Sequence, residues 1–206
     1  MQRAEHDGRK KDTGFNPMGM VDLLRADPLY ARFMWWMSVF GFGNLMLAAP
    51  MTFVSTDELK LDYTEGIMIN AIVPLLIMPL AIPLWARLMS RTHIIQFRSI
   101  HGWSFVLASV AVTLASYLHS IQLLYLGSAL LGVGYAGGTL AWNLGHQDFA
   151  SAERDAEYMA VHVTLNGIRG IFAPLAAWGL HQWLAPLGYA PLVLVICTVI
   201  NTIGVL

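Results

Sequence analysis

Polar and aromatic residues occur within long apolar stretches of this sequence, at spacings that suit the binding of a small molecule. Tyr135, Thr139, Trp142, Asn143 and His146 follow one another at offsets of four, three, one and three residues. On an α-helix these offsets place all five side chains on one broad face. Their hydroxyl, indole, amide and imidazole groups can donate hydrogen bonds to a ligand, and all but the indole can accept them.

Two further amides, Asn44 and Asn70, are set in apolar sequence. An interhelical hydrogen bond is the ordinary explanation for such an amide, and contact with a bound solute is the alternative. The candidate residues for the wall of a substrate cavity are therefore Asn44, Asn70, Tyr135, Trp142 and Asn143.

Glycine is unusually frequent in the run that carries Tyr135 and Trp142. Small residues let helices approach closely, so tight packing is the simplest explanation for these glycines, which are Gly127, Gly132, Gly134, Gly137 and Gly138. A Gly-x-Gly sequence also occurs in an earlier apolar run, as GFGNL over residues 41–45 against GVGYA over residues 132–136. This weak repeat is of the kind that two related three-helix units leave in a sequence.

The sequence contains no recognisable set of catalytic residues. His146, Asp148, Glu157 and His162 lack metal-ligand spacing, and Ser128 lacks the G-x-S-x-G setting of a nucleophile. There is also no phosphate-binding glycine loop with a lysine. We therefore expect no enzyme, no metal site, no catalytic residues and no cofactor.

The elements that position the candidate residues follow from where charges are missing. The chain has 206 residues, of which 56% are hydrophobic and 12% charged, against about 25% charged in soluble domains. No Asp, Glu, Lys or Arg occurs in Phe33–Thr56, Gly66–Ala86, Ser99–Gln147 or Gly170–Leu206. About 20 apolar helical residues cross a bilayer, so the first two windows hold one span each and the longer two hold two each.

The sequence therefore predicts an all-α integral membrane protein with six transmembrane helices. Polar, proline and glycine residues divide the long windows and place the spans near 33–54, 66–86, 100–117, 122–146, 162–184 and 189–206. Residues 29–206 would form the transmembrane domain. Residues 1–28 are polar and predict a flexible cytoplasmic tail, which becomes a short interfacial helix within residues 20–33.

The basic residues predict the orientation of the chain. With these spans, eleven of the twelve Lys and Arg residues fall on one side of the membrane, and Lys60 is the exception. By the positive-inside rule the N-terminus is cytoplasmic, and we expect the bacterial inner (plasma) membrane as the location. Nothing in the sequence indicates nucleic-acid binding, and the basic residues of the tail are more simply a topology signal than a lipid-binding patch.

Asn166 and Arg169 are one helical turn apart near the beginning of the fifth predicted span. A guanidinium is costly inside a membrane unless it is paired or reaches the interface. We therefore expect Arg169 to extend to the cytoplasmic surface. The alternative is that it holds a gate or an anionic group.

Two segments carry a family resemblance. The loop WARLMSRTH, residues 85–93, is similar to the cytoplasmic loop motif of the major facilitator superfamily: Leu88 and Arg91 fit the motif, while its glycines and acidic residue are replaced by Ala86, His93 and Ser90. The run NGIRGIFAPLAAWGL, residues 166–180, resembles the glycine- and proline-rich fifth or eleventh helix of such proteins. Over about residues 28–206 the chain resembles the C-terminal six-helix half of a twelve-helix member.

The resemblance implies one half-bundle of the major facilitator fold, with 3+3 helix repeats. It implies secondary transport of a small solute, whose identity the sequence leaves open, by alternating access against a second six-helix bundle in a homodimer or a partner chain. The candidates for the gate and cytoplasmic loop are Arg87, Arg91 and Arg169. The alternative is a non-transporting membrane subunit or scaffold derived from a transporter and packed into a larger membrane complex.

Overall fold

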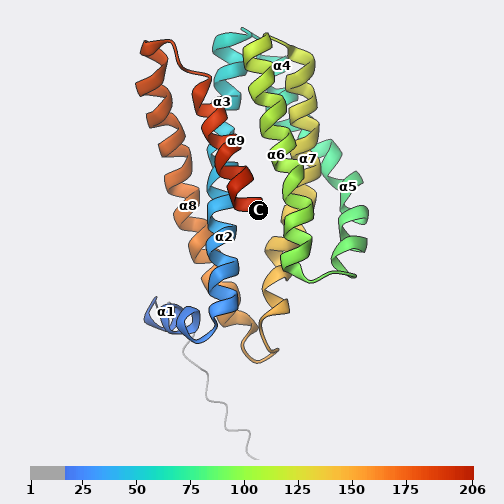
Figure 1. The fold of residues 1–206 in the computed structure, drawn as a ribbon. Helices are drawn as coiled ribbons and strands as arrows, with labels where there is room; N and C mark the ends of the chain where they lie inside the picture. The colour runs from blue at the N-terminus through green and yellow to red at the C-terminus, as the bar shows by residue number, and fades with distance from the viewer. Residues whose placement is uncertain (1–16) are drawn as a thin grey trace, which may run out of the picture.

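A computed structural model of the chain describes residues 17–206, which form a bundle of long helices running up and down (Figure 1). The predicted tail up to residue 16 lies outside the described residues. Next to it, α1 (Pro17–Ala26) lies across one end of the bundle. The short helix predicted within residues 20–33 is divided, because α1 ends at Ala26 and a new helix begins at Pro28.

The remaining helices form six rods. They are α2 (Pro28–Met46) continued by α3 (Ala48–Phe53) and the π-helix η1 (Val54–Glu58); α4 (Tyr63–Ile67), the π-helix η2 (Met68–Ile72) and α5 (Val73–Met89); α6 (Ile94–Leu118); α7 (Ile121–Leu144) with the 3₁₀-helix η3 (Gly145–Asp148); α8 (Asp155–Leu184) with the 3₁₀-helix η4 (Ala185–Leu187); and α9 (Leu192–Val205). Each predicted span coincides largely with one of these rods.

Four of these rods are long and apolar enough to cross a membrane within the described part of the chain. They are Pro28–Glu58, Tyr63–Met89, Ile94–Leu118 and Ile121–Asp148. Of the other two, α8 has 30 residues but begins with Asp155 and Glu157 and contains Arg169, and α9 is apolar but has 14 residues. The described chain is thus an all-helical membrane protein in which four spans follow from length and composition alone.

Local capping explains where several helices begin. Asp27 accepts a hydrogen bond of 2.9 Å from the Tyr30 backbone, and Pro28 occupies the first turn of α2, where a missing N–H costs nothing. Asp62 caps α4 in the same way, by accepting from the Glu65 backbone at 2.7 Å. Between α6 and α7, His119 has a left-handed backbone with φ of 49°, which reverses the chain within two residues.

The rods pack in the order α8, α2, α9, α6, α7 and α5. They therefore form two groups of three, one of α2, α8 and α9 and the other of α5, α6 and α7, which are joined mainly by contact between α6 and α9 (Figure 1). The central helices of the two groups, α2 and α7, pack against their own groups rather than against each other.

Glycines set the closest approaches. A Cβ added to Gly43 in α2 would lie 2.8 Å from the backbone nitrogen of Asn201 in α9. In α7, the predicted packing role is confirmed for the four glycines whose added Cβ would meet another helix within 3.0 Å, which are Gly127, Gly132, Gly134 and Gly137. Gly138 differs, since its nearest neighbour would be the Phe105 ring at 3.8 Å.

Replacing Gly43 with alanine should destabilise the bundle, because the new Cβ meets the α9 backbone, which cannot move aside as a flexible side chain can. We expect a loss of about 1 to 3 kcal/mol in the free energy of unfolding, measured by thermal unfolding in detergent. Gly179→Ala is the matched control, since Gly179 in α8 has nothing within 4 Å of an added Cβ. Equal midpoint temperatures of unfolding for Gly43→Ala and Gly179→Ala would contradict the close packing of α2 against α9.

Candidate functional site

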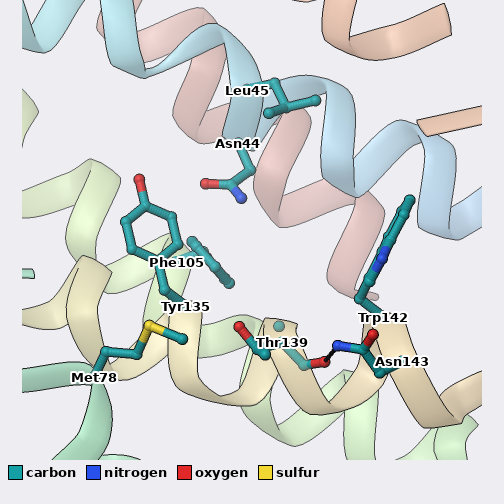
Figure 2. A pocket seen from close by; sticks show the side chains of 9 residues that line it. Asn44, Leu45, Met78, Phe105, Tyr135, Thr139, Trp142 and Asn143 are labelled. Carbon is teal, nitrogen blue, oxygen red and sulfur yellow. Dashed lines mark hydrogen bonds between the residues drawn. The ribbon is translucent and has the colours of Figure 1, made fainter. Parts of the chain in front are cut away.

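A cavity of about 430 Å³ lies where α2 and α7 face each other (Figure 2). Its wall is formed by side chains and backbone from α2, α5, α6 and α7. The lining residues are Asn44, Leu45, Met78, Phe105, Tyr135, Gly138, Thr139, Trp142 and Asn143. The volume suits a small organic molecule, and the lining combines aromatic surface with a few polar groups, as is usual for ligand pockets.

Four of the five residues proposed from the sequence gather around this cavity, namely Asn44, Tyr135, Trp142 and Asn143. Asn70 does not line it. The Asn70 Nδ2 donates hydrogen bonds to Ser55 Oγ at 3.1 Å and to the Gly66 carbonyl at 2.9 Å. The first of these bonds joins the π-helices η1 and η2, so Asn70 makes the interhelical hydrogen bond that was the ordinary explanation for this amide.

Sequence reasoning missed Met78 and Phe105, which reach the cavity from α5 and α6. Both are ordinary apolar residues in apolar helices, so no residue type distinguishes them there. Phe105 is buried, and its ring packs edge-on against Phe40 at 5.5 Å and against Tyr135 at 5.8 Å between centroids. Phe105 thus provides a buried aromatic contact for the Tyr135 ring.

Most of the polar groups in the wall are available to a ligand. The Asn143 Nδ2 donates to the Thr139 carbonyl in its own helix at 2.7 Å. The side chains of Asn44 and Tyr135, by contrast, make no hydrogen bond with any described residue. Figure 2 shows Asn44 on α2 and Tyr135 on α7 on opposite sides of the cavity, so both can bind one solute.

The Trp142 ring connects the cavity to a buried histidine. Its centroid lies 4.5 Å from that of His162 in α8, at a steep angle. His162 is completely buried, and neither of its ring nitrogens has a hydrogen-bond partner among the described residues. Nearby, His146 Nε2 lies 3.0 Å from Asp155 Oδ1, at the end where α7 and α8 are joined.

Arg169 does not extend to the surface, and the prediction that it reaches the cytoplasmic interface was wrong. Its side chain is directed toward α2, and the residue is only 5% exposed. The Nε and Nη2 atoms donate to Asn166 Oδ1 at 3.1 and 2.9 Å, and Nη1 donates to the Met37 carbonyl at 2.8 Å. The guanidinium fits there because Gly41 has no side chain: an added Cβ would lie 2.8 Å from Arg169 Nε.

Arg87 and Arg91, the other two gate candidates, are exposed at the end of α5 and in the loop after it. Neither forms an ion pair with the described residues. The loop is held by the Ser90 hydroxyl, which donates to the Arg87 carbonyl at 3.0 Å, and by the Arg91 amide, which donates to the Leu88 carbonyl at 3.0 Å. A gating role for these arginines stays a prediction.

The same end of the bundle carries a hydrogen-bonded group that the sequence did not reveal. The Tyr30 hydroxyl donates to the Tyr158 carbonyl at 2.7 Å, and the Tyr158 hydroxyl donates to Asp27 Oδ2 at 2.8 Å. Burial, followed by the hydrogen bond to Asp27, raises the pKa of Tyr158 above its ordinary value. The protonated hydroxyl therefore ties the beginning of α8 to the beginning of α2.

No group of three or more His, Cys, Asp and Glu side chains that could hold a metal ion occurs in residues 17–206. The pair His146 and Asp155 stands without a third such group.

Comparison with known proteins identifies a family. The family model of the Major Facilitator Superfamily matches residues 3–174, which is most of the chain. The match begins in the N-terminal tail and ends within α8. It confirms the resemblance inferred from the loop and the glycine-rich helix. No curated protein and no solved structure matches the chain.

The neighbouring glycines 137 and 138 provide a test of the cavity position. Gly138→Ala should leave the unfolding temperature near that of the wild type, because its Cβ projects into the cavity at ordinary contact distance. Gly137→Ala should lower it, since its Cβ would lie 2.5 Å from the buried His101 ring, at a cost of about 1 to 3 kcal/mol. Thermal unfolding of both variants in the same detergent measures the difference, and a reversed order would show that the cavity lies elsewhere.

Proposed function

The chain belongs to the major facilitator superfamily, and we propose that it is one half of a secondary transporter that moves a small solute by alternating access. The proposal rests mainly on the cavity between α2 and α7, where the polar groups of Asn44 and Tyr135 make no hydrogen bond with any residue in 17–206. Unpaired polar groups at membrane depth are unfavourable unless water or a solute binds them. A second six-helix bundle, from a homodimer or a partner chain, would complete the transporter.

In this proposal α8 and α9 are the fifth and sixth membrane spans. Both pack along α2, which is itself long and apolar enough to cross the membrane. The outer surface of α8 supports the assignment, because it exposes large apolar side chains to its surroundings, namely Ile168, Ile171, Phe172, Leu175 and Trp178. In water such a surface would be unfavourable, whereas lipid or another bundle can cover it.

The packing order supports two related three-helix units. The first rod packs on the fifth and sixth, and the fourth packs on the second and third. If rods one, two and three are exchanged with rods four, five and six, the contacts of the first rod become those of the fourth, and the reverse. The contact between the third and sixth rods is unchanged by the same exchange. This is the pattern expected of 3+3 repeats.

The two Gly-x-Gly sequences give the same correspondence at single residues. In the first repeat, on α2, the first glycine faces α8 and the second faces α9. In the second repeat, on α7, the first glycine faces α5 and the second faces α6. The contacts are Gly41 with Arg169 and Gly43 with Asn201, and Gly132 with Pro74 and Gly134 with Phe105. The next residues, Asn44 and Tyr135, both line the cavity.

Alternating access requires a partner because this cavity is open. Tyr135 is 40% exposed, and Asn143 and Thr139 are exposed beside it. One bundle therefore forms one wall of a solute site, and the opposite wall must come from a second bundle. Rocking of the two bundles would open the site to each side of the membrane in turn.

The distribution of basic residues supports a cytoplasmic N-terminus. One end of the bundle carries Arg25 and Arg32 near α1, Arg87 in the last turn of α5, Arg91 in the loop after it and Arg154 before α8, whereas Lys60 belongs to the other end. The positive-inside rule assigns the arginine-rich end to the cytoplasm. In a bacterium this protein would lie in the inner membrane.

One observation favours the second candidate, a non-transporting subunit of a larger membrane complex. Three glycines of α8 have open space where a Cβ would lie, namely Gly167, Gly170 and Gly179. A helix surface of this kind can pack closely against another membrane helix. The two functions differ in whether water and solutes reach the cavity.

Cysteine labelling tests whether the cavity is open to water. In a Cys197→Ala background, which removes the single and buried native thiol, cysteines at Asn44, Tyr135 and Asn143 should react with a membrane-impermeant maleimide. Leu80→Cys is the matched control, because Leu80 is 76% exposed but on an apolar surface of α5, where lipid suppresses thiolate formation. No labelling of the three cavity positions in any assembly state would refute the transporter proposal.

The mass of the particle in lipid nanodiscs tests the requirement for a second bundle. We expect a homodimer or a complex with one other six-helix chain, since a single bundle has no second wall. A particle that contains one copy of this chain alone would contradict the proposal. Isolation within a large assembly, with the cavity cysteines unreactive, would support the second candidate.

A further inference from the structure

The charged residues buried in the described part of the chain are both arginines. Arg98 and Arg169 are each 5% exposed, whereas no Asp or Glu is buried there. Neither arginine forms an ion pair with a described residue. A buried charge without an opposite charge is strongly unfavourable. The interior of the bundle therefore carries positive charge that its own carboxylates do not neutralise.

The two arginines differ in what replaces a carboxylate. Arg98 donates through Nη1 to the Gly204 carbonyl, in the last turn of α9. The carboxyl end of a helix carries partial negative charge, so α9 itself compensates Arg98 in part. Arg169 binds the neutral amide of Asn166 and the Met37 carbonyl in the interior of α2. Its charge has no comparable compensation.

Arg169 is not one of the residues that line the solute cavity, but it packs against the α2 helix that forms part of the cavity wall. It packs against Gly41, which is one helical turn before the cavity residue Asn44 on α2. On α8, His162 is two turns from Arg169 and contacts the cavity residue Trp142. The two α8 side chains thus pack behind the cavity wall, Arg169 against α2 and His162 against the Trp142 ring of α7.

The guanidinium retains donors for a ligand. It has five N–H groups, of which one on Nε, one on Nη1 and one on Nη2 are engaged. One N–H on each terminal nitrogen therefore has no partner among the described residues. A pair of donors on the two terminal nitrogens is the arrangement that a carboxylate bridges. His162 adds two ring nitrogens that are buried and have no hydrogen-bond partner in the described part of the chain.

We propose that the solute is an organic carboxylate with an aromatic or apolar body, whose charged group binds at Arg169 while Phe105, Tyr135 and Trp142 contact the remainder. This proposal rests on the proposed transport function and names the substrate class of the same cavity. The carboxylate supplies the negative charge that the bundle lacks at Arg169. Asn44, one helical turn after Gly41 on α2, can donate a hydrogen bond from its side-chain amide to a polar group elsewhere on the solute.

Benzoate and benzamide test this proposal, because they share size and ring and differ in charge. The full chain, in its native assembly state in nanodiscs, is equilibrated with radiolabelled benzoate. Unlabelled benzoate or unlabelled benzamide is then added as a competitor, and the amount of bound label is measured. We expect benzoate to bind at least about tenfold more tightly than benzamide, which corresponds to one charge-assisted hydrogen-bonded pair. Equal binding of the two compounds, or no binding of benzoate, would overturn the proposal.

Variants assign the preference to a residue. Arg169→Gln should abolish the preference for benzoate, and Arg169→Lys should retain part of it because the positive charge remains. Arg98→Gln is the matched control, since Arg98 is equally buried but bound to α9. This variant should prefer benzoate over benzamide to the same extent as the wild type. Loss of the preference in Arg98→Gln to the same extent as in Arg169→Gln would refute a specific role of Arg169.

A perturbation from α2 covers the case in which Arg169→Gln does not fold. Gly41→Ala leaves the arginine in place but puts a Cβ 2.8 Å from its Nε, so it should displace the guanidinium and reduce the preference for benzoate. An unchanged preference in Gly41→Ala, with the Arg169→Gln protein unfolded, would contradict the proposal.

Protection experiments separate this proposal from the transporter proposal. Benzoate should protect Asn44→Cys from the impermeant maleimide, and benzamide at equal concentration should protect it less. If the cysteine reacts and benzoate gives no protection, the cavity is open and the substrate class is wrong. If the cysteine does not react in any assembly state, the transporter proposal itself fails, and the carboxylate proposal fails with it.

Discussion

Close approach of helix backbones at glycine is the constraint on which this bundle depends. In lipid no hydrophobic force drives helices together, so contact area and small residues must do so. Gly43 brings α2 against α9, while Gly132 and Gly134 bring α7 against the beginning of α5 and against α6. A side chain at any of these positions would separate the helices and lose the packing along their length.

The cavity is a consequence of the same packing. Because α2 is drawn toward α8 and α9, and α7 toward α5 and α6, the two central helices leave a space between their facing surfaces. Gly138 adds to this space because its missing side chain faces the cavity rather than a neighbouring helix. Polar groups such as those of Asn44 and Tyr135 are tolerable there, whereas on the surface facing lipid they would be costly.

The sequence predicted the positions of the helices well, because charges are excluded from the hydrocarbon region and their absence defines the windows. Asn44, Tyr135, Trp142 and Asn143, which the sequence proposed because a polar residue in an apolar helix tends to face the protein interior, lie together around one cavity, and their contact with a solute stays a prediction. The sequence could not find Met78 and Phe105, because an apolar residue is equally suitable for lipid, core and cavity. The sequence also could not decide whether an amide in an apolar helix bonds to another helix or to a solute. Asn70 bonds to Ser55 of another helix.

Arg169 shows why the expectation of a surface position failed. The argument from cost compared burial in lipid with escape to the interface, but it did not include a site built by other helices. Such a site exists because Gly41 leaves room for the guanidinium and because Met37 and Asn166 provide oxygen acceptors. The missing side chain of Gly41 thus admits a positive charge behind the α2 wall of the cavity. Hydrogen bonds to neutral oxygens lower the cost of that charge but leave it in place, so a positive charge without an ion pair among the described residues lies close to the cavity wall. Packing and ligand preference therefore depend on the same residue pair.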